Sequence, residues 1–292
     1  MKKIYLIINP RAGHGTMEKN IGQLLNFFEK YEVAVSYNFT KSGGHAVELA
    51  QKAVLDDYNI IVAVGGDGTV NEVAGGLAGK NIPMGIIPVG SGNGLAHDLK
   101  IPTNIKKAVE IIVNGTDHNI DLWQMNYKLF LCAAGLGFDA AVAHEMALST
   151  RRGRAEYSRL TIKEGIVAKP VDMSLQIGGK KIEKPVFLAS FVNASQYGNN
   201  AYISPGAKTD DGLLDVILIK PISKFLYPVL GASLFLGIIH WFRFYERYYA
   251  DSIIINNATT NLFHFDGESV EMEFPVHINL LKKKLEIRVL LR

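Results

Sequence analysis

Cysteine is almost absent from this sequence of 292 residues, which contains a single one, Cys132. One thiol excludes an intramolecular disulfide and every metal site built from several cysteines, and its apolar neighbours indicate a small buried residue. An excess of one charge is also missing, because 31 basic residues nearly balance 28 acidic ones. The net charge of +3 therefore gives no reason to expect a nucleic acid partner.

Apolar runs of membrane-spanning length are lacking as well. Residues 225–241 are interrupted by Pro228 and His240 and fall short of the ~20 residues that a spanning helix needs. The run at 4–8 is too short for a secretory signal, and no small-residue cleavage site follows it. We therefore expect a cytoplasmic protein. Residues 225–241, which precede Arg243 and Arg247, either dock at a membrane surface or form a buried helix.

Strand and helix patterns alternate through the first part of the chain. Apolar runs predict strands at 3–8, 33–39, 60–64 and 84–88, and helical spacing predicts helices at 17–31, 44–55, 70–77 and 105–114. Such alternation is typical of a doubly wound, mostly parallel sheet. We predict an α/β domain over residues 1–122.

The pattern changes near residue 121 to short segments rich in β-branched and aromatic residues. Gly178-Gly179 and Asp266-Gly267 predict hairpin turns, and helical passages are predicted at 154–168 and 224–239. These features favour an antiparallel β-sandwich or barrel-like sheet over residues 123–292. Whether the final strand, predicted at 285–291, returns to the first domain stays open.

Three predicted strands end in the loops Asn9-Pro10-Arg11-Ala12-Gly13, Gly65-Gly66-Asp67-Gly68-Thr69, and Pro88-Val89-Gly90-Ser91-Gly92-Asn93. We expect these loops to converge on one edge of the sheet. Ligands bind at the carboxyl ends of the strands in such sheets, and a helix start that follows offers N–H groups to phosphate. The alternative is a set of tight turns with helix caps. A carboxylate repels phosphate, so Asp67 fits this seat if it binds a cation or takes a proton.

Acidic and basic clusters mark the second half. Asp266-Gly267-Glu268 is either a plain hairpin or a pair of functional acids, and residues 210–215 form either a turn or an oxygen-ligand site for Mg²⁺ or Ca²⁺. Arg151 and Arg152 are either a solvated face or the charge that neutralises a transferring phosphate.

The run from Gly65 to Glu72, with Asn9-Pro10 before it and the 88–93 loop after it, resembles the diacylglycerol kinase catalytic-domain family, which includes sphingosine kinases. The glycine–aspartate run alone is shared with NAD kinases, and Asn71-Glu72 makes the match more specific. Asp211-Gly212-Leu213 and Asp266-Gly267-Glu268 resemble later motifs of the family in the expected order. The resemblance spans essentially the whole chain. It implies a kinase with a nucleotide-binding α/β domain and a lipid-binding β-sandwich.

The resemblance also implies roles for individual residues. Asp67, Asp266 and Glu268 would be catalytic, with either aspartate as the general base. Asp211 and Leu213 would belong to a structural Mg²⁺ site. The implied nucleotide-binding residues are Asn9, Arg11, Thr40, His45, Gly65, Gly66, Gly68, Thr69, Ser91, Asn93, Arg151 and Arg152.

The reaction implied is transfer of the γ-phosphate of ATP, with Mg²⁺, to the hydroxyl of diacylglycerol or a sphingoid base. The third loop reads Gly90-Ser91-Gly92-Asn93-Gly94, where many bacterial diacylglycerol kinases have Gly-Thr-x-Asn-Asp, so the acceptor stays open. An NAD kinase and a non-catalytic nucleotide- or lipid-binding protein are the rival readings. The expected partner is a membrane lipid met transiently at the inner membrane surface. A homodimer stays an open alternative.

Overall fold

The structure, a computed structural model, describes residues 1–15, 17–151 and 153–290. The chain divides into two compact units, Met1–Leu122 with Lys282–Arg292 as unit 1, and Trp123–Leu281 as unit 2. Two strands, β5 (Thr116–Met125) and β16 (Val276–Val289), have residues in both units.

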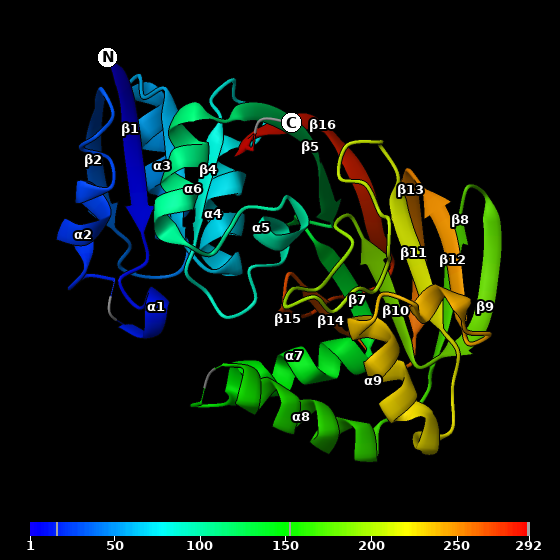
Figure 1. The fold of residues 1–292 in the computed structure, drawn as a ribbon. Coiled ribbons are helices and arrows are strands. Elements are labelled where there is room, and N and C mark those ends of the chain that lie inside the picture. Colours follow the sequence, from blue (N-terminus) through cyan, green and yellow to red (C-terminus); the bar gives the residue numbers. More distant parts are fainter. Residues whose placement is uncertain (16, 152, 291–292) are drawn as a thin grey trace. The chain divides into compact units, whose positions relative to one another are not determined.

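Unit 1 is a parallel sheet with helices (Figure 1). Its strand order is β2-β1-β3-β4, and the register aligns the carboxyl ends of all four strands. Every residue of β3 is buried, as expected for a strand covered on both faces. The strands are β1 (Lys2–Ile8), β2 (Val33–Phe39), β3 (Ile60–Gly65) and β4 (Met84–Pro88).

The helices of unit 1 bury apolar stripes. The two longest pack closely because Gly76 leaves room; a Cβ atom there would lie 2.6 Å from the Cβ of Ala50. The helices are α1 (Ala12–Gly15), α2 (Ile21–Asn26), α3 (His45–Leu55), α4 (Asp67–Leu77), α5 (Gly94–Asp98) and α6 (Ile105–Asn114).

The end of the chain is tied into unit 1. Ile287 of β16 pairs with Met84 of β4. The buried guanidinium of Arg288 donates hydrogen bonds to the carbonyls of Ile112 and Val113, at the end of α6, and to the Asp117 carboxylate. The last strand therefore adds to the sheet of the first unit.

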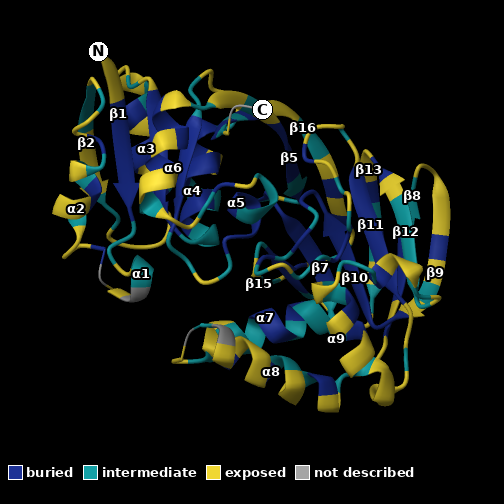
Figure 2. Ribbon diagram, in the orientation of Figure 1, coloured by how far each residue is buried: buried dark blue, intermediate teal, exposed yellow. Residues whose placement is uncertain are grey.

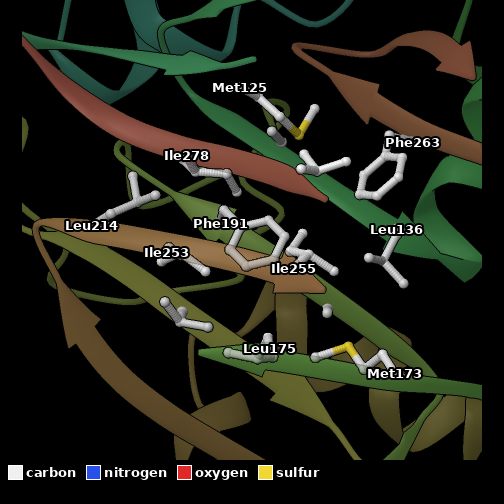
Figure 3. Close-up of a cluster of buried hydrophobic side chains, with 14 of the residues drawn as sticks. Met125, Leu136, Met173, Leu175, Phe191, Leu214, Ile253, Ile255, Phe263 and Ile278 are labelled. Carbon is white, nitrogen blue, oxygen red and sulfur yellow. The ribbon is translucent and has the colours of Figure 1, made fainter. Parts of the chain in front are cut away.

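Unit 2 contains a six-stranded antiparallel sheet with the order β12-β11-β10-β7-β14-β15. Facing it are β13, β8, β9, β6 and the unit 2 parts of β5 and β16, and an apolar core fills the space between these layers (Figure 3). The strands are β6 (Lys128–Phe130), β7 (Ala133–Gly137), β8 (Val171–Ile177), β9 (Lys180–Val186), β10 (Leu188–Val192), β11 (Leu214–Ile219), β12 (Tyr245–Ala250), β13 (Ser252–Ala258), β14 (Leu262–Phe265) and β15 (Glu268–Glu271).

A helical layer covers the other face of the six-stranded sheet. Here Phe187, Leu188, Val192 and Ile217 pack with Leu230 in a second apolar cluster. The elements of this layer are α7 (Phe138–Leu148), α8 (Arg154–Val167), η1 (Lys224–Leu226), α9 (Tyr227–Phe235) and η2 (Ile239–Trp241). No helix in the described ranges is long and apolar enough to cross a membrane.

Three ion pairs, built on two carboxylates, hold the β12 edge of unit 2. Burial raises the pKa of Glu246, but bonds from Lys184, Lys220 and the Tyr248 hydroxyl outweigh it and lower that pKa to about 2. Asp215 is bonded by Arg247 at 2.7 Å and by the Ser204 hydroxyl at 2.7 Å. Burial is nevertheless the larger influence on Asp215 and raises the pKa of its carboxyl.

The predicted fold class is confirmed, with a mostly parallel α/β part and an antiparallel β-sandwich. Both predicted hairpins form, each with positive φ at both turn residues. Several boundaries were wrong. The final strand begins at Val276, the helix predicted at 17–31 is limited to α2, and the helix predicted at 224–239 is divided among η1, α9 and η2.

The elements of unit 2 that were not predicted include α7 and β12, and β9 was implied only by the predicted turn before it, without bounds. In the case of β9 the reason is its place at the edge of a sheet, where lysines and Pro185 are tolerated because no further strand pairs there. Its alternation is therefore weak in the sequence.

Candidate functional site

The carboxyl ends of the four parallel strands of unit 1 form one edge. Ile8 pairs with Phe39 on one side and with Val64 on the other, and Gly65 pairs with Pro88. Backbone hydrogen bonds continue beyond the strands, from Asn9 N–H to the Val64 carbonyl and from Gly13 N–H to the Val89 carbonyl. The predicted meeting of the three loops at one edge is therefore confirmed.

The first glycine of the central loop makes room for a side chain. A Cβ atom at Gly65 would lie 2.4 Å from Thr69 Oγ1, so no larger residue fits while Thr69 occupies its place. Thr69 is buried, and its hydroxyl accepts a hydrogen bond from Asn9 Nδ2 at 3.3 Å. These contacts join the first loop to the start of α4.

The second and third loops touch through their backbones. A Cβ atom at Gly90 would lie 2.4 Å from the Cα of Gly66. Asn93 closes the third loop on itself: its Oδ1 accepts from Gly90 N–H at 3.0 Å, and its Nδ2 donates to the Gly90 carbonyl at 2.8 Å. Asn93 has φ = 54°, in the left-handed region that asparagine tolerates well. The amide of Asn93 therefore shapes the loop.

Asp67, the first residue of α4, holds the third loop in place. Its Oδ2 accepts from Asn93 N–H at 2.8 Å, and its Oδ1 accepts from Gly94 N–H at 2.7 Å. A Cβ atom at Gly92 would lie 2.7 Å from the same carboxylate. Backbone N–H groups stabilise the ionised form of a carboxylate, so these bonds explain an acid at this helix start. Asp67 joins the two glycine-rich loops.

Glu72 fixes the segment that leads into α3. Its Oε2 accepts from Ala46 N–H at 3.1 Å, which satisfies a donor in the first turn of that helix. Next to it, Lys41 N–H donates to His45 Nδ1 at 3.1 Å. Sequence reasoning treated Glu72 as part of a motif and assigned it no task. Glu72 lies four residues after Gly68 in α4, which is about one helical turn, so the two residues share one side of the helix. That spacing is the signal in the sequence that could have placed Glu72 near the loops.

The other predicted nucleotide residues of unit 1 also lie at this edge. Arg11 and Ser91 are exposed, and Thr40, His45, Gly66 and Gly68 are partly exposed. The edge thus presents a cationic side chain, a hydroxyl and the first turn of α4, which are suited to bind an anion such as phosphate.

In unit 2, Asp266 is held as firmly as Asp67. It begins the two-residue turn after β14 and has φ = 46°. Its carboxylate accepts three backbone N–H groups, from Leu131 at 2.7 Å, Cys132 at 2.8 Å and Ala133 at 3.1 Å. Glu268, the first residue of β15, is exposed. The predicted pair thus consists of a tightly positioned carboxylate and an exposed one.

Of the two predicted arginines, the structure describes only Arg151. Arg151 is exposed and lines a pocket of about 460 Å³ together with Arg159 and Glu156, whose carboxylate is bonded to the Arg159 guanidinium. Bonds from Arg159 and Ser149 lower the pKa of Glu156 to about 2. Arg152 lies outside the described residues.

The predicted Mg²⁺ ligands are close neighbours, but they do not form a complete set of side-chain ligands. Asp211 is exposed, and its Oδ1 accepts from Leu213 N–H at 3.1 Å. Within residues 1–15, 17–151 and 153–290, no three His, Cys, Asp or Glu side chains are grouped as a metal site would require. A cation at Asp211 would need backbone carbonyls and water as its other ligands.

A row of buried polar residues crosses three strands of unit 2 and was not predicted. Ser190, Gly135 and His264 stand side by side on β10, β7 and β14. His264 Nε2 lies 3.0 Å from Asp139 Oδ2, and the Tyr197 hydroxyl bonds both Asp139 and Ser190. A Cβ atom at Gly135 would lie 2.8 Å from Asp139 Oδ2, so the glycine provides the space for this row.

This polar row contacts β14, the strand that leads to Asp266. Burial, followed by the nearby Asp139 carboxylate, raises the pKa of Tyr197 well above its usual value, so the hydroxyl remains a donor. His264 lies on β14, two residues before Asp266, which begins the turn after that strand. Nothing in the local sequence indicates the row, because its members are distant in sequence and meet only by strand pairing.

Comparison with known proteins identifies the class. Residues 3–125 match the family described as "Diacylglycerol kinase catalytic domain", and residues 132–289 match the "YegS C-terminal NAD kinase beta sandwich-like domain". A crystal structure of a diacylglycerol kinase from Bacillus anthracis has the same fold, with a TM-score of 0.74 at 23% identity, covering 99% of this chain and 97% of that one. Fold and loops thus define a kinase of the α/β plus β-sandwich type.

Curated relatives define the family. The chain is 31% identical over 225 residues to a diacylglycerol kinase of Bacillus subtilis, covering 75% of this chain and 74% of that protein. It is 32% identical over 244 residues to a diacylglycerol kinase of Mycobacterium tuberculosis, covering 80% and 79%. The chain belongs to the diacylglycerol kinase family, a family of lipid kinases. The predicted resemblance is confirmed.

Proposed function

We propose that this protein transfers the γ-phosphate of ATP to the hydroxyl of a membrane lipid, with diacylglycerol as the first acceptor to test and a sphingoid base as the alternative. The observation that carries the proposal is the edge of unit 1, where the strand-end loops after β1, β3 and β4 are locked together by Asn9, Asp67 and Asn93. The names of its relatives favour diacylglycerol.

The nucleotide belongs at this edge in our proposal. The start of α4 and the backbone of the 90–93 loop would bind the phosphates, and Arg11 would add a positive charge. Thr40, His45 and Ser91 would line the rest of the site. Mg²⁺ is part of the proposal because phosphoryl transfer needs its charge to neutralise the oxygens of ATP.

The acids have separate roles in this proposal. Asp67 positions the third loop through its two N–H bonds, and Asp266 or Glu268 accepts the proton of the lipid hydroxyl. A general base of this kind typically contributes 10²–10⁴-fold to the rate. Asp266 has its position set by three backbone donors, which suits a base whose geometry must be constant. Arg151 is proposed to counter phosphate charge.

The test is transfer of labelled γ-phosphate from ATP to diacylglycerol, to sphingosine and to NAD, each presented separately, with and without EDTA. We expect labelled diacylglycerol or sphingosine and no product when EDTA removes Mg²⁺. Label on NAD alone would overturn the proposal in favour of an NAD kinase. Binding of ATP without any product would favour a non-catalytic nucleotide-binding protein.

A matched pair of variants tests the nucleotide site. Arg11→Gln should raise the KM for ATP about tenfold or more, since a bond to phosphate from a charged side chain is worth roughly 1.5–3 kcal/mol. Lys19→Gln removes another exposed positive charge from unit 1 and should leave that KM unchanged. Equal values for both variants would remove Arg11 from the site.

A further inference from the structure

The buried polar row of unit 2 includes an acceptor atom that none of the described residues satisfies. His264 Nε2 lies 3.0 Å from the Asp139 carboxylate, so this nitrogen carries the hydrogen and, in the neutral ring, Nδ1 is left as an acceptor. His264 is 4% exposed, and no donor of the described residues reaches its Nδ1. A buried polar atom without a partner is rare and costly in folded proteins. A donor from outside the chain is therefore expected here.

The other members of the row add a carboxylate and no cationic side chain. The Tyr197 hydroxyl donates to Asp139 Oδ2 at 3.0 Å and is bonded to Ser190 Oγ at 2.9 Å. Asp139 Oδ1 accepts from the N–H of Ala140 at 2.9 Å. No lysine or arginine belongs to this network. A ligand that presents N–H or O–H groups, and above all an ammonium group, therefore complements the row.

The row lies next to Asp266, one of the two acids proposed as the general base. His264 is on β14 and Asp266 begins the turn after it, so the two residues are at most about 7 Å apart along the chain. On the neighbouring strand, Gly135 of the row closely follows Cys132 and Ala133, whose N–H groups hold the Asp266 carboxylate. A lipid whose reacting hydroxyl meets Asp266 would therefore bring its adjacent polar groups close to this row.

Tyr157 of α8 links the row to the surface of unit 2. The strands β7 and β10 are buried, whereas α8 is largely exposed (Figure 2). Tyr157 is 49% exposed, yet burial of its hydroxyl, followed by the charge of Asp139, raises the pKa of Tyr157 to about 12. Its side chain thus extends from the surface toward Asp139. This is the side from which a ligand would reach the row.

The two acceptors of the proposed function differ in the groups that they would present here. In a sphingoid base the two carbons that follow the reacting hydroxyl carry an ammonium group and a second hydroxyl, which are hydrogen-bond donors. In diacylglycerol the corresponding carbons carry ester oxygens, which only accept. An ester would place one more acceptor against Nδ1 of His264 and the Asp139 carboxylate, with no hydrogen between them. A site built for a donor discriminates strongly against an analogue that lacks it.

We propose that Asp139, His264 and Tyr197 form a subsite for the acceptor lipid that binds a donor group next to the reacting hydroxyl, so that the protein prefers a 2-amino alcohol, a sphingoid base, to diacylglycerol. His264 Nδ1 accepts from the lipid, the Asp139 carboxylate offsets the charge of the ammonium group, and Tyr197 holds Asp139 in place. The inference rests on the proposed function and chooses between its two acceptors. The names of the relatives favour the other acceptor, so the two grounds give opposite expectations.

A ratio of two rates tests the subsite. The full-length protein is given ATP and either short-chain sphinganine or short-chain diacylglycerol in detergent micelles, and kcat/KM is measured for each lipid. We expect the wild type to prefer sphinganine. His264→Phe and Asp139→Asn should each lower the ratio of sphinganine to diacylglycerol about tenfold or more, because a hydrogen bond to a charged group is worth at least that factor. General damage to the fold would lower both rates alike and leave the ratio unchanged.

Ser204→Ala is the matched control. Ser204 is buried in the same unit, and its hydroxyl also donates to a buried carboxylate, that of Asp215, at 2.7 Å. This variant should be less stable than the wild type and should keep the wild-type ratio of the two rates. If the wild type prefers diacylglycerol, or if His264→Phe and Asp139→Asn keep the ratio, then the row binds no part of the acceptor and the proposal is wrong.

Binding without ATP separates this proposal from the proposed function. In protein labelled with ¹⁵N-histidine, the NMR signal of His264 Nδ1, assigned by its loss in His264→Phe, should shift when short-chain sphinganine is added and should stay in place with diacylglycerol. If the wild type phosphorylates no lipid, the proposed function fails, and a shift with sphinganine alone would still establish the subsite. If the protein phosphorylates sphinganine and the Nδ1 signal does not move, the subsite is overturned while the proposed function stands.

Discussion

Replacing Asp67 by asparagine tests whether its carboxylate holds the two glycine-rich loops together. In the structure one oxygen accepts from Gly94 N–H at 2.7 Å and the other from Asn93 N–H at 2.8 Å. Asparagine is nearly the same size but has one acceptor oxygen. In either orientation of the amide, its NH₂ group would therefore face a backbone N–H that now has no acceptor.

The magnitude follows from these two bonds. A hydrogen bond to a charged group is worth roughly 1.5–3 kcal/mol, and leaving a buried N–H unpaired costs about 1–3 kcal/mol. The lost charge at the first turn of α4 adds roughly 0.3–1 kcal/mol. Because Asp67 is only partly buried, we take the lower part of this range and expect Asp67→Asn to lower the free energy of unfolding by about 3–4 kcal/mol.

Urea denaturation measures the free energy, and amide hydrogen exchange shows where it is lost. The amides of Asn93 and Gly94 should exchange faster in the variant, and ATP should bind more weakly because the loop is less ordered. The control is Asp57→Asn at an exposed aspartate with φ = 59°, where asparagine is equally tolerated; it should change stability by less than about 0.5 kcal/mol.

One result would refute this reasoning. If Asp67→Asn is as stable as the wild type and binds ATP equally well, yet transfers no phosphate, then the carboxylate acts at the reacting centre and does not serve to hold the loop.

Three other substitutions test the packing and charges of the two units. Gly65→Ala places a Cβ atom 2.4 Å from the Thr69 hydroxyl, so thermal unfolding should show that the free energy of unfolding falls by about 1–3 kcal/mol. The control is Gly22→Ala, where no atom lies within 4 Å of the new Cβ, and it should show no loss of stability. Equal stabilities of the two variants would refute the crowding at Gly65. Arg247→Met leaves the buried Asp215 carboxylate without its cation and should cost about 3–5 kcal/mol in urea at pH 7, and less at pH 4 because protonation removes the unpaired charge. Glu246 has its folded-state pKa lowered from 4.5 to about 2, so its roughly 2–3 kcal/mol of stability is present above pH 4.5 and is lost as the pH falls toward 2. In Glu246→Gln the melting temperature should depend less on pH between 4.5 and 2 than in the wild type. If the melting temperature falls as steeply with pH in both proteins, the assignment to Glu246 is wrong.

Local patterns predicted the α/β part well because its signals are short in range. Buried parallel strands are continuous apolar runs, so β4 was placed at its observed bounds. The partly exposed strand β2 was also placed at its observed bounds. Turn residues with positive φ likewise marked both hairpins of unit 2. The strand β9 was harder to predict: it is exposed on much of its length, and its lysines and proline resemble those of a loop.

By itself the sequence determined the class of the protein, the edge of the sheet at which ligands should bind and the family to which the motifs belong. Those properties depend on residues that are neighbours along the chain. The tertiary structure decided what the motif residues do: Gly65 makes room for Thr69, Gly66 touches Gly90, and Asp67 holds a loop that begins more than twenty residues later. It also brought together the buried row at His264. Each depends on contacts between distant segments, which a local pattern does not encode because chain folding alone brings those residues together.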